Sequence, residues 1–166
     1  MNVNGTKASS NGTGKNEPSG GAERLMCRGL RGATTVNSND RDEILEATRE
    51  LLSMIVRVND IDIADIASIY LTTTDDLDAT YPAFAARQLG WFDLALLCGH
   101  EMGVPDGLPL CIRVLIHWNT TKSAAEISHI YLRNAKSLRA DRDNIPPIRP
   151  VQMSNMDAAM KVLANG

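Results

Sequence analysis

One charged residue in an apolar segment carries the clearest chemical information in this 166-residue chain. Arg113 interrupts the run Cys111-Ile112-Arg113-Val114-Leu115-Ile116, whose aliphatic and β-branched side chains are typical of a strand. Alternation along a strand places Arg113 on the same face as Cys111 and Leu115. A guanidinium stays charged in proteins, and its desolvation is costly unless an anion meets it. We therefore expect an anionic partner beside Arg113, which is either a protein carboxylate or a ligand.

Other side chains could join Arg113 in binding or transforming a small anion. They are Arg31, Arg87, Cys98, Glu101, Tyr131 and Arg139. Taken singly, each has an ordinary structural interpretation, such as a solvated arginine or a small core cysteine. His100 beside Glu101 suggests acid–base catalysis, but adjacent residues usually point apart, and no nucleophile triad or glycine-rich phosphate loop accompanies them. From the residues alone, the sequence predicts a pocket with several arginines for a small polyanion.

Composition excludes several classes of protein. The net charge of −3, without a basic stripe, argues against nucleic-acid binding. Three cysteines without a C-x-x-C pair fit a reducing compartment, and three widely spaced histidines give no metal-ligand spacing. The apolar stretches are too short to span a bilayer, and no signal-type apolar segment follows the N-terminus. We expect a cytoplasmic protein that uses no metal or cofactor and binds neither nucleic acid nor membranes.

The chain divides into three parts by composition. Residues 1–23 are rich in Gly, Ser, Asn and Thr and are predicted to be disordered. A plastid-type targeting peptide is the alternative, but the segment has no arginine and two glutamates. Residues 24–140 have a globular pattern. Residues 141–166 form a C-terminal extension in which a proline-rich connector precedes a short amphipathic helix at 154–164.

The elements that must position these side chains can be read from periodicity and breakers. Strands are expected at 25–32, 66–71, 92–98, 111–118 and 129–132, with a helical turn at 123–127.

Two main helices are also expected. The first begins at Asn39 or Asp40, with Glu43 completing a capping box, and buries the face that carries Ile44, Thr48, Leu51, Leu52, Ile55 and Val58. The second begins at Pro82 and ends at Gly90. This order predicts an α+β fold, a mixed and largely antiparallel sheet with both helices on one face. The other face would need cover, which favours oligomerisation.

A set of motifs in one order resembles a known family. The motifs are Arg31-Gly-Ala-Thr-Thr-Val36, Tyr81-Pro82-Ala83, Cys98-x-x-Glu101-Met102, Cys111-Ile-Arg113-Val114, Tyr131-Leu132 and Leu138-Arg139. Together they closely resemble the monofunctional, trimeric chorismate mutases of the AroH class, over residues 25–140. The resemblance implies a homotrimer built as a pseudo-α/β barrel, with active sites at subunit interfaces. It implies an isomerase of aromatic amino acid biosynthesis that converts chorismate to prephenate without a cofactor.

The resemblance also implies roles for residues. Arg113 would stabilise the negative charge that grows on the ether oxygen of chorismate, and Arg31 would anchor a substrate carboxylate. Glu101 and the region of Cys98 would receive the ring hydroxyl, and Tyr131 would contact a carboxylate.

Further residues would complete the pocket by the same resemblance. Arg87 would lie near its entrance, Tyr81 in its wall, and Leu138 and Arg139 in the C-terminal segment that borders it. The chain departs from the family pattern at Phe84, where a lysine is common, at Tyr81, where phenylalanine is common, and at Gly99-His100.

Two alternatives stay open on the sequence. One is a trimeric small-carboxylate-binding or deaminase-like protein of the related fold. The other is a non-catalytic trimer in which Arg113 only pairs with Glu101 or an aspartate. In that second case, Arg113→Met would be neutral or stabilising, as for other buried ion pairs.

Overall fold

The computed structural model describes residues 24–142. The predicted disorder of residues 1–23 and the predicted helix at 154–164 lie outside this range. Within it, the strands are β1 (Met26–Thr35), β2 (Ile66–Thr73), β3 (Leu96–His100), β4 (Cys111–Thr120) and β5 (Ile130–Tyr131). The helices are α1 (Arg41–Asn59) and α2 (Ala83–Gln88), with 3₁₀ segments η1 (Ile63–Asp65), η2 (Ala124–Glu126) and η3 (Arg133–Arg142). The predicted elements are all present, although β1 ends later and β3 begins later than the sequence indicates.

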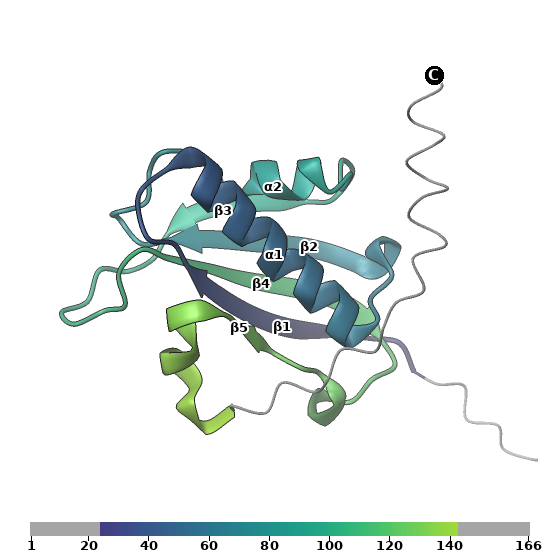
Figure 1. The fold of residues 1–166 in the computed structure, drawn as a ribbon. Coiled ribbons are helices and arrows are strands. Elements are labelled where there is room, and N and C mark those ends of the chain that lie inside the picture. Colours follow the sequence, from purple (N-terminus) through teal and green to yellow (C-terminus); the bar gives the residue numbers. More distant parts are fainter. Residues whose placement is uncertain (1–23, 143–166) are drawn as a thin grey trace, which may run out of the picture.

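The five strands form one mixed sheet in the order β3-β2-β4-β1-β5 (Figure 1). The central strand β4 runs antiparallel to both β1 and β2, and these two ladders are the longest in the sheet. The edge strands β3 and β5 instead run parallel to their neighbours β2 and β1. The predicted α+β class with a mixed sheet is therefore confirmed, and β4, which carries Arg113, lies at its centre.

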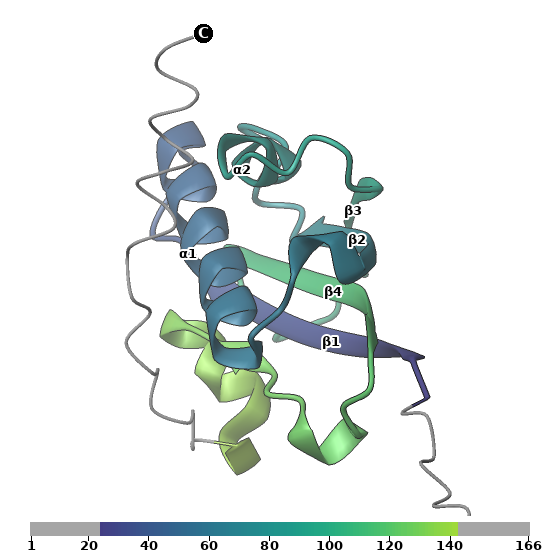
Figure 2. The same ribbon diagram turned by 90° about the vertical axis from the view of Figure 1, so that its right-hand side faces the viewer.

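Both α-helices pack on one face of the sheet (Figures 1 and 2). Leu51, Leu52 and Ile55 of α1 are completely buried, as are Leu30 of β1 and Ile69 of β2 in the same core. Burying one such side chain contributes about 1.5–3 kcal/mol. Because the helices pack tightly against one face of the sheet, the strands are fixed in place. Side chains on the opposite face therefore extend from a rigid backbone.

The helix caps differ in one detail from the prediction. The carboxylate of Asp40 accepts hydrogen bonds from the backbone N–H groups of Asp42 and Glu43, at 2.9 and 3.0 Å, and so begins α1 as expected. The expected capping box is wrong in its partner, because the Glu43 carboxylate accepts from Asn37 and Ser38 instead. Glu43 thereby fixes the chain between β1 and α1.

The end of α1 shows a second difference. Val58, predicted on the buried face, is only half-buried. Asn59 is buried instead, and its amide donates to the backbone carbonyls of Ile55 and Ser128. At α2, Pro82 precedes the helix, and Gly90 leaves it with a φ of 84°, which glycine adopts without strain.

The sheet face opposite the helices is partly open in the single chain. Tyr70 of β2 and Leu97 of β3 are 45% and 54% exposed. Such exposed apolar side chains on one sheet face mark a surface that another molecule can cover. Among the described helices, none has the length and apolar character needed to cross a membrane.

Candidate functional site

The open face of the sheet contains a cavity of about 500 Å³ that gathers most of the predicted site residues. It is lined by Arg31, Gly32, Ala33, Tyr70, Thr72, Glu101, Arg113, Val114, Leu115, Tyr131, Leu138 and Arg139. We call it the sheet-face pocket. Six predicted residues lie together here although they come from four separate parts of the chain: Arg31, Glu101, Arg113, Tyr131, Leu138 and Arg139.

The register of the strands explains how Arg113 is accommodated. Arg113 on β4 lies directly between Ala33 of β1 and Thr72 of β2. Side chains that face each other across such ladders share one face of the sheet. The small methyl group of Ala33 leaves space beside the guanidinium, and the hydroxyl of Thr72 supplies a polar neighbour.

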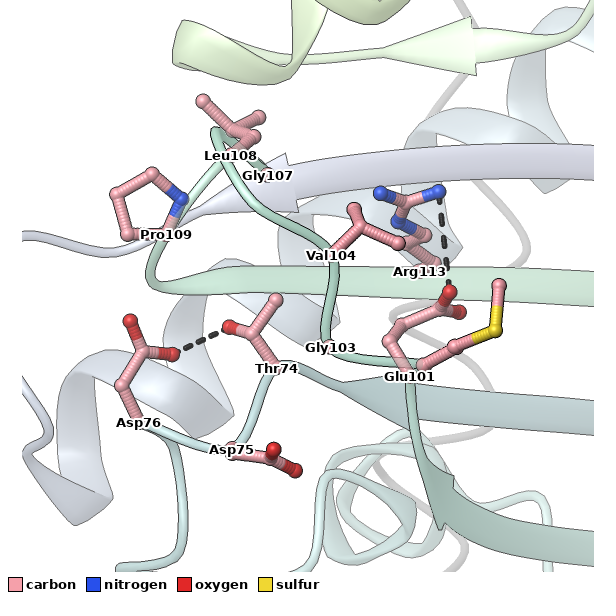
Figure 3. Close-up of a pocket in the computed structure, with 11 residues that line it drawn as sticks. Thr74, Asp75, Asp76, Glu101, Gly103, Val104, Gly107, Leu108, Pro109 and Arg113 are labelled. Carbon is pink, nitrogen blue, oxygen red and sulfur yellow. Dashed lines mark hydrogen bonds and ion pairs between the residues drawn. The ribbon is translucent and has the colours of Figure 1, made fainter.

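Arg113 has an anionic partner, as its position in the strand predicts. Its Nη1 lies 3.8 Å from Oε2 of Glu101, an ion pair that Figure 3 shows beside the loop following β3. The other carboxylate oxygen of Glu101 accepts a hydrogen bond from the hydroxyl of Thr72. The pair is loose, and the Arg113 side chain is 39% exposed, so the guanidinium keeps donors that can reach a ligand.

One hydrogen-bond donor of Arg113 has no acceptor in the described part of the chain. Its Nε is buried and makes no hydrogen bond with residues 24–142. The neighbouring thiol of Cys111 has a pKa that burial raises, and the charge on Arg113 opposes this rise. Arg113 is therefore a cation that the protein only partly satisfies.

The other cations of the sheet-face pocket stand around Arg113. Arg31 is exposed and lines the pocket, and its guanidinium makes no ion pair within residues 24–142. Arg139 interrupts η3 with a non-helical backbone conformation, and its neighbour Leu138 packs near Tyr131. The pocket lining thus contains three arginines and one carboxylate, so its charge favours an anionic ligand with more than one negative group.

Three predicted residues lie elsewhere in the single chain. Tyr81 and Cys98 line a different cavity of about 580 Å³, together with Phe84 and His100, which we call the α2 pocket. Arg87 lines neither cavity, but its guanidinium carbon lies 5.5 Å from the centre of the Phe84 ring. The structure of one chain therefore divides the predicted site into two groups.

The α2 pocket contains a thiol and an imidazole that sequence reasoning considered. Burial raises the pKa of the Cys98 thiol. A hydrogen bond with the backbone of Ala83 and the charge on Arg87 lower this pKa, but these two effects together are smaller than that of burial. His100 has Nδ1 within 3.8 Å of an Asp75 carboxylate oxygen and lines the α2 pocket, whereas Glu101 lines the sheet-face pocket. The two adjacent residues thus face different cavities.

A third cavity, of about 260 Å³, lies beside Glu101 and Arg113 under the loop between β3 and β4 (Figure 3). Asp76 braces the end of this loop. One of its carboxylate oxygens accepts from the hydroxyl of Thr74, and the other accepts from the backbone N–H of Leu110 at 2.9 Å. The bracing fixes the start of β4, two residues before Arg113.

Sequence reasoning missed Thr72, which contacts Glu101, and Asp76, which braces β4. The predicted strand ends at residue 71, one residue before Thr72, but β2 continues to Thr73. Thr72 is two residues after Tyr70, so alternation along the strand could have placed its side chain on the open face. Its pairing with Arg113 could not be predicted without knowing the register between the strands. Within residues 24–142, no three His, Cys, Asp or Glu side chains are grouped to hold a metal ion.

The fold and the pocket define an α+β protein whose sheet carries a pocket lined by three arginines and one glutamate. Residues 27–142 match the family model described as chorismate mutase type I. The chain is 42% identical to chorismate mutase AroH of Thermus thermophilus over 72% of its own length and 98% of that protein. It is 41% identical to chorismate mutase AroH of Bacillus subtilis, over 70% of this chain and 93% of that one. A solved chorismate mutase from Clostridium thermocellum superposes with a TM-score of 0.66 at 47% identity, covering 66% of this chain and 98% of that chain.

The chain belongs to the type I chorismate mutase family. Members of this family are isomerases that convert chorismate to prephenate, and the resemblance noted in the sequence is confirmed.

Proposed function

We propose that the protein rearranges chorismate to prephenate in the sheet-face pocket, with Arg113 as the central catalytic cation. The reaction is an intramolecular Claisen rearrangement, in which the ether C–O bond breaks as a C–C bond forms. Negative charge grows on the ether oxygen in the transition state. A fixed cation aimed at this oxygen binds the transition state more tightly than the substrate, and only that difference accelerates the reaction.

The observation that carries the proposal is the partly satisfied guanidinium of Arg113. Its only ion pair in the described chain is the 3.8 Å contact with Glu101, and its Nε has no hydrogen-bond acceptor there. The central strand and the row Ala33–Arg113–Thr72 hold it in place before substrate arrives. Such a preorganised donor needs little rearrangement during the reaction, which is the basis of electrostatic catalysis.

The roles of the remaining pocket residues follow from the family resemblance. Arg31 would bind one carboxylate of chorismate in a bidentate contact that a lysine could not make. The hydroxyl of Tyr131 would donate a hydrogen bond to a substrate carboxylate. Glu101, held by Thr72, would accept the ring hydroxyl. Leu138 and Arg139 would close the pocket and hold the substrate in a compact, near-attack conformer.

The cysteines support a mechanism without a covalent intermediate. Burial raises the pKa of both the Cys98 and the Cys111 thiols. A thiolate is the nucleophilic form of cysteine, so both residues are poor nucleophiles near neutral pH. Cys98 would instead act as a neutral hydrogen-bonding or packing group for the ring hydroxyl.

We further propose that the protein is a homotrimer whose active sites lie between subunits. Two observations support this assembly: the exposed apolar side chains on the open sheet face, and the division of predicted site residues into two pockets of one chain. In a cyclic assembly, the α2 pocket of one subunit can meet the sheet-face pocket of the next. Tyr81, Cys98 and Arg87 of one chain would then complete the site around Arg113 of its neighbour.

The proposal is tested with purified protein and chorismate, following loss of chorismate and formation of prephenate. We expect rapid turnover by the wild type. In Arg113→Ala, kcat should fall by a factor on the order of 10²–10³ or more, because a full charge is removed. Thermal unfolding of the variant should remain cooperative. No turnover by a folded, trimeric wild type would overturn the proposal and favour a carboxylate-binding trimer.

A solvent isotope effect gives an independent check on the mechanism. No proton is transferred in the proposed chemical step, so turnover in heavy water should match that in ordinary water closely. A large effect on the chemical step would instead require general acid–base catalysis, for which His100 would be the first candidate to substitute.

A further inference from the structure

One side chain just before α2 and two side chains on α2 form a ladder that ends in a cation. Tyr81 lies two residues before α2, whereas Phe84 and Arg87 are three residues apart on α2 and are therefore neighbours on the helix surface. The ring centres of Tyr81 and Phe84 lie 6.3 Å apart at an interplanar angle of 65°, an edge-on aromatic contact. The guanidinium carbon of Arg87 then lies 5.5 Å from the centre of the Phe84 ring.

The two aromatic members of the ladder belong to the wall of the α2 pocket. Tyr81 and Phe84 both line this cavity, and Phe84 is 40% exposed. Arg87 is exposed beside it, and its charge reaches Cys98 in the same pocket, where it lowers the thiol pKa against the larger effect of burial. Arg87 is therefore close enough to act electrostatically on a ligand that enters the α2 pocket.

Within residues 24–142, the cation–π contact with the Phe84 ring is the one specific interaction of the Arg87 guanidinium. The guanidinium makes no hydrogen bond or ion pair with a carboxylate in this part of the chain. An exposed arginine without a carboxylate partner normally samples many rotamers, and ordering it costs free energy when it binds an anion. A ring beneath the guanidinium reduces this cost and leaves the N–H donors at its edge available.

We propose that Phe84 is a positioning residue, which holds the guanidinium of Arg87 over its ring so that Arg87 meets an anionic ligand in a restricted geometry. Phe84 carries no charge itself and acts on binding through Arg87. The inference rests on the proposed function, in which Arg87 contributes to a site for the dianion chorismate. It assigns to Phe84 a part in substrate capture that its apolar side chain does not suggest.

The test compares Phe84→Leu with Phe84→Tyr. Leucine keeps an apolar side chain of similar reach but removes the aromatic face, whereas tyrosine retains that face. We expect Phe84→Leu to raise KM for chorismate roughly two- to fivefold with a smaller change in kcat, the range for loss of an exposed cation–π contact. Phe84→Tyr should restore KM to nearly the wild-type value.

A double-mutant cycle separates positioning from direct contact. If Phe84 acts through Arg87, Phe84→Leu should have almost no further effect on KM in an Arg87→Ala background. An undiminished effect in that background would overturn the inference, as would an unchanged KM in Phe84→Leu alone. Phe92→Leu is the matched control, because Phe92 is 73% exposed and lines none of the three cavities described above.

An NMR measurement on the trimeric or monomeric protein tests the stack without substrate. The side-chain methylene protons of Arg87 should show an upfield ring-current shift that Phe84→Leu abolishes and Phe84→Tyr keeps. Absence of that shift in the wild type overturns the inference even if chorismate turnover is normal. A clear shift in a protein that fails to convert chorismate would overturn the proposed function and leave the positioning of Arg87 intact.

Discussion

The hydroxyl of Thr72 donates a hydrogen bond to Glu101, and this contact orients the carboxylate that stands beside the central arginine. The second oxygen of Glu101 lies 3.8 Å from Arg113. Thr72 and Arg113 face each other across the β2–β4 ladder, so the sheet sets all three positions at once. In the proposed function, a carboxylate restrained in this way would accept a hydrogen bond from the substrate hydroxyl while it stays apart from the guanidinium.

Thr72→Val tests this orientation, because valine keeps the shape of threonine and removes the hydroxyl. We expect kcat for chorismate to fall roughly fivefold, the effect of losing one hydrogen bond of about 1 kcal/mol. Thermal stability should change little, since Thr72 is only partly buried. Thr72→Ser is the control and should keep most of the activity. If Thr72→Val has wild-type kinetics, the hydrogen bond does not contribute to positioning Glu101.

The division of the site between two pockets leads to a prediction about mixed trimers. We expect Arg113→Ala and Arg87→Ala subunits, co-expressed with different tags and purified as mixed trimers, to be more active than the average of the two separate variants. In every cyclic trimer that contains both variants, one of the three interfaces would pair an intact Arg113 with an intact Arg87. Turnover of chorismate per site is the measurement.

The control for this experiment mixes two tagged copies of Arg113→Ala, in which no interface recovers Arg113. If both arginines serve from the same chain, mixing the two variants cannot generate an intact site, and activity will stay at the average of the parents. That result, or a monomer in analytical ultracentrifugation, would contradict the proposed shared site.

Much of the fold could be predicted because its signals are local. Alternation placed Arg113 on the face of Cys111 and Leu115, and the apolar spacing in α1 gave its buried face. Pro82 and Gly90 marked the ends of α2 correctly, since their backbone preferences depend on one or two residues.

The arrangement of the site was harder to predict because it depends on pairing between distant strands. The row Ala33–Arg113–Thr72 joins residues from three strands, and a shift of one residue would turn each side chain to the other face. Glu43 was misassigned because a carboxylate near a helix start can reach several backbone N–H groups, and packing selects among them. The motif resemblance implied a set of site residues and sites between subunits, but it did not show which of these residues share a cavity within one chain.

Gly32 tests how tightly α1 is packed behind the pocket. A methyl group at Gly32 would lie 2.8 Å from Cδ1 of Ile55 and 2.9 Å from the backbone oxygen of Ile130. The second contact involves backbone of the neighbouring strand, so relief requires a shift of β5. We expect Gly32→Ala to reduce the free energy of unfolding by about 1–3 kcal/mol or more. Chemical denaturation at fixed protein concentration measures this change.

Gly99→Ala is the matched control, because a methyl group there would meet nothing within 4 Å. Its free energy of unfolding should stay within about 0.5 kcal/mol of the wild type. Equal destabilisation by the two substitutions would show that the close approach at Gly32 does not limit packing.

The protonation of Cys98 gives a prediction for pH dependence. Burial raises the pKa of the thiol above its ordinary value of 9.0, and the backbone of Ala83 and the charge on Arg87 offset only part of the rise. Alkylation at Cys98, resolved from the other cysteines by peptide mapping, should therefore reach half its maximal rate above pH 9.0. Half-maximal alkylation near neutral pH would reveal a thiolate and reopen covalent catalysis.

The raised pKa of Cys98 also predicts how the stability of the protein changes at alkaline pH. A folded-state pKa raised above the unfolded value means that the folded protein holds the Cys98 proton more tightly. The resulting stabilisation is complete below about pH 9.0 and is lost as the pH rises through the folded pKa. The free energy of unfolding, measured by denaturation at about pH 8 and about pH 10, should therefore fall less in Cys98→Ser than in the wild type. Because the proposed chemistry needs the neutral thiol, Cys98→Ser should also retain most chorismate turnover near neutral pH, whereas a nucleophilic Cys98 would make that variant inactive.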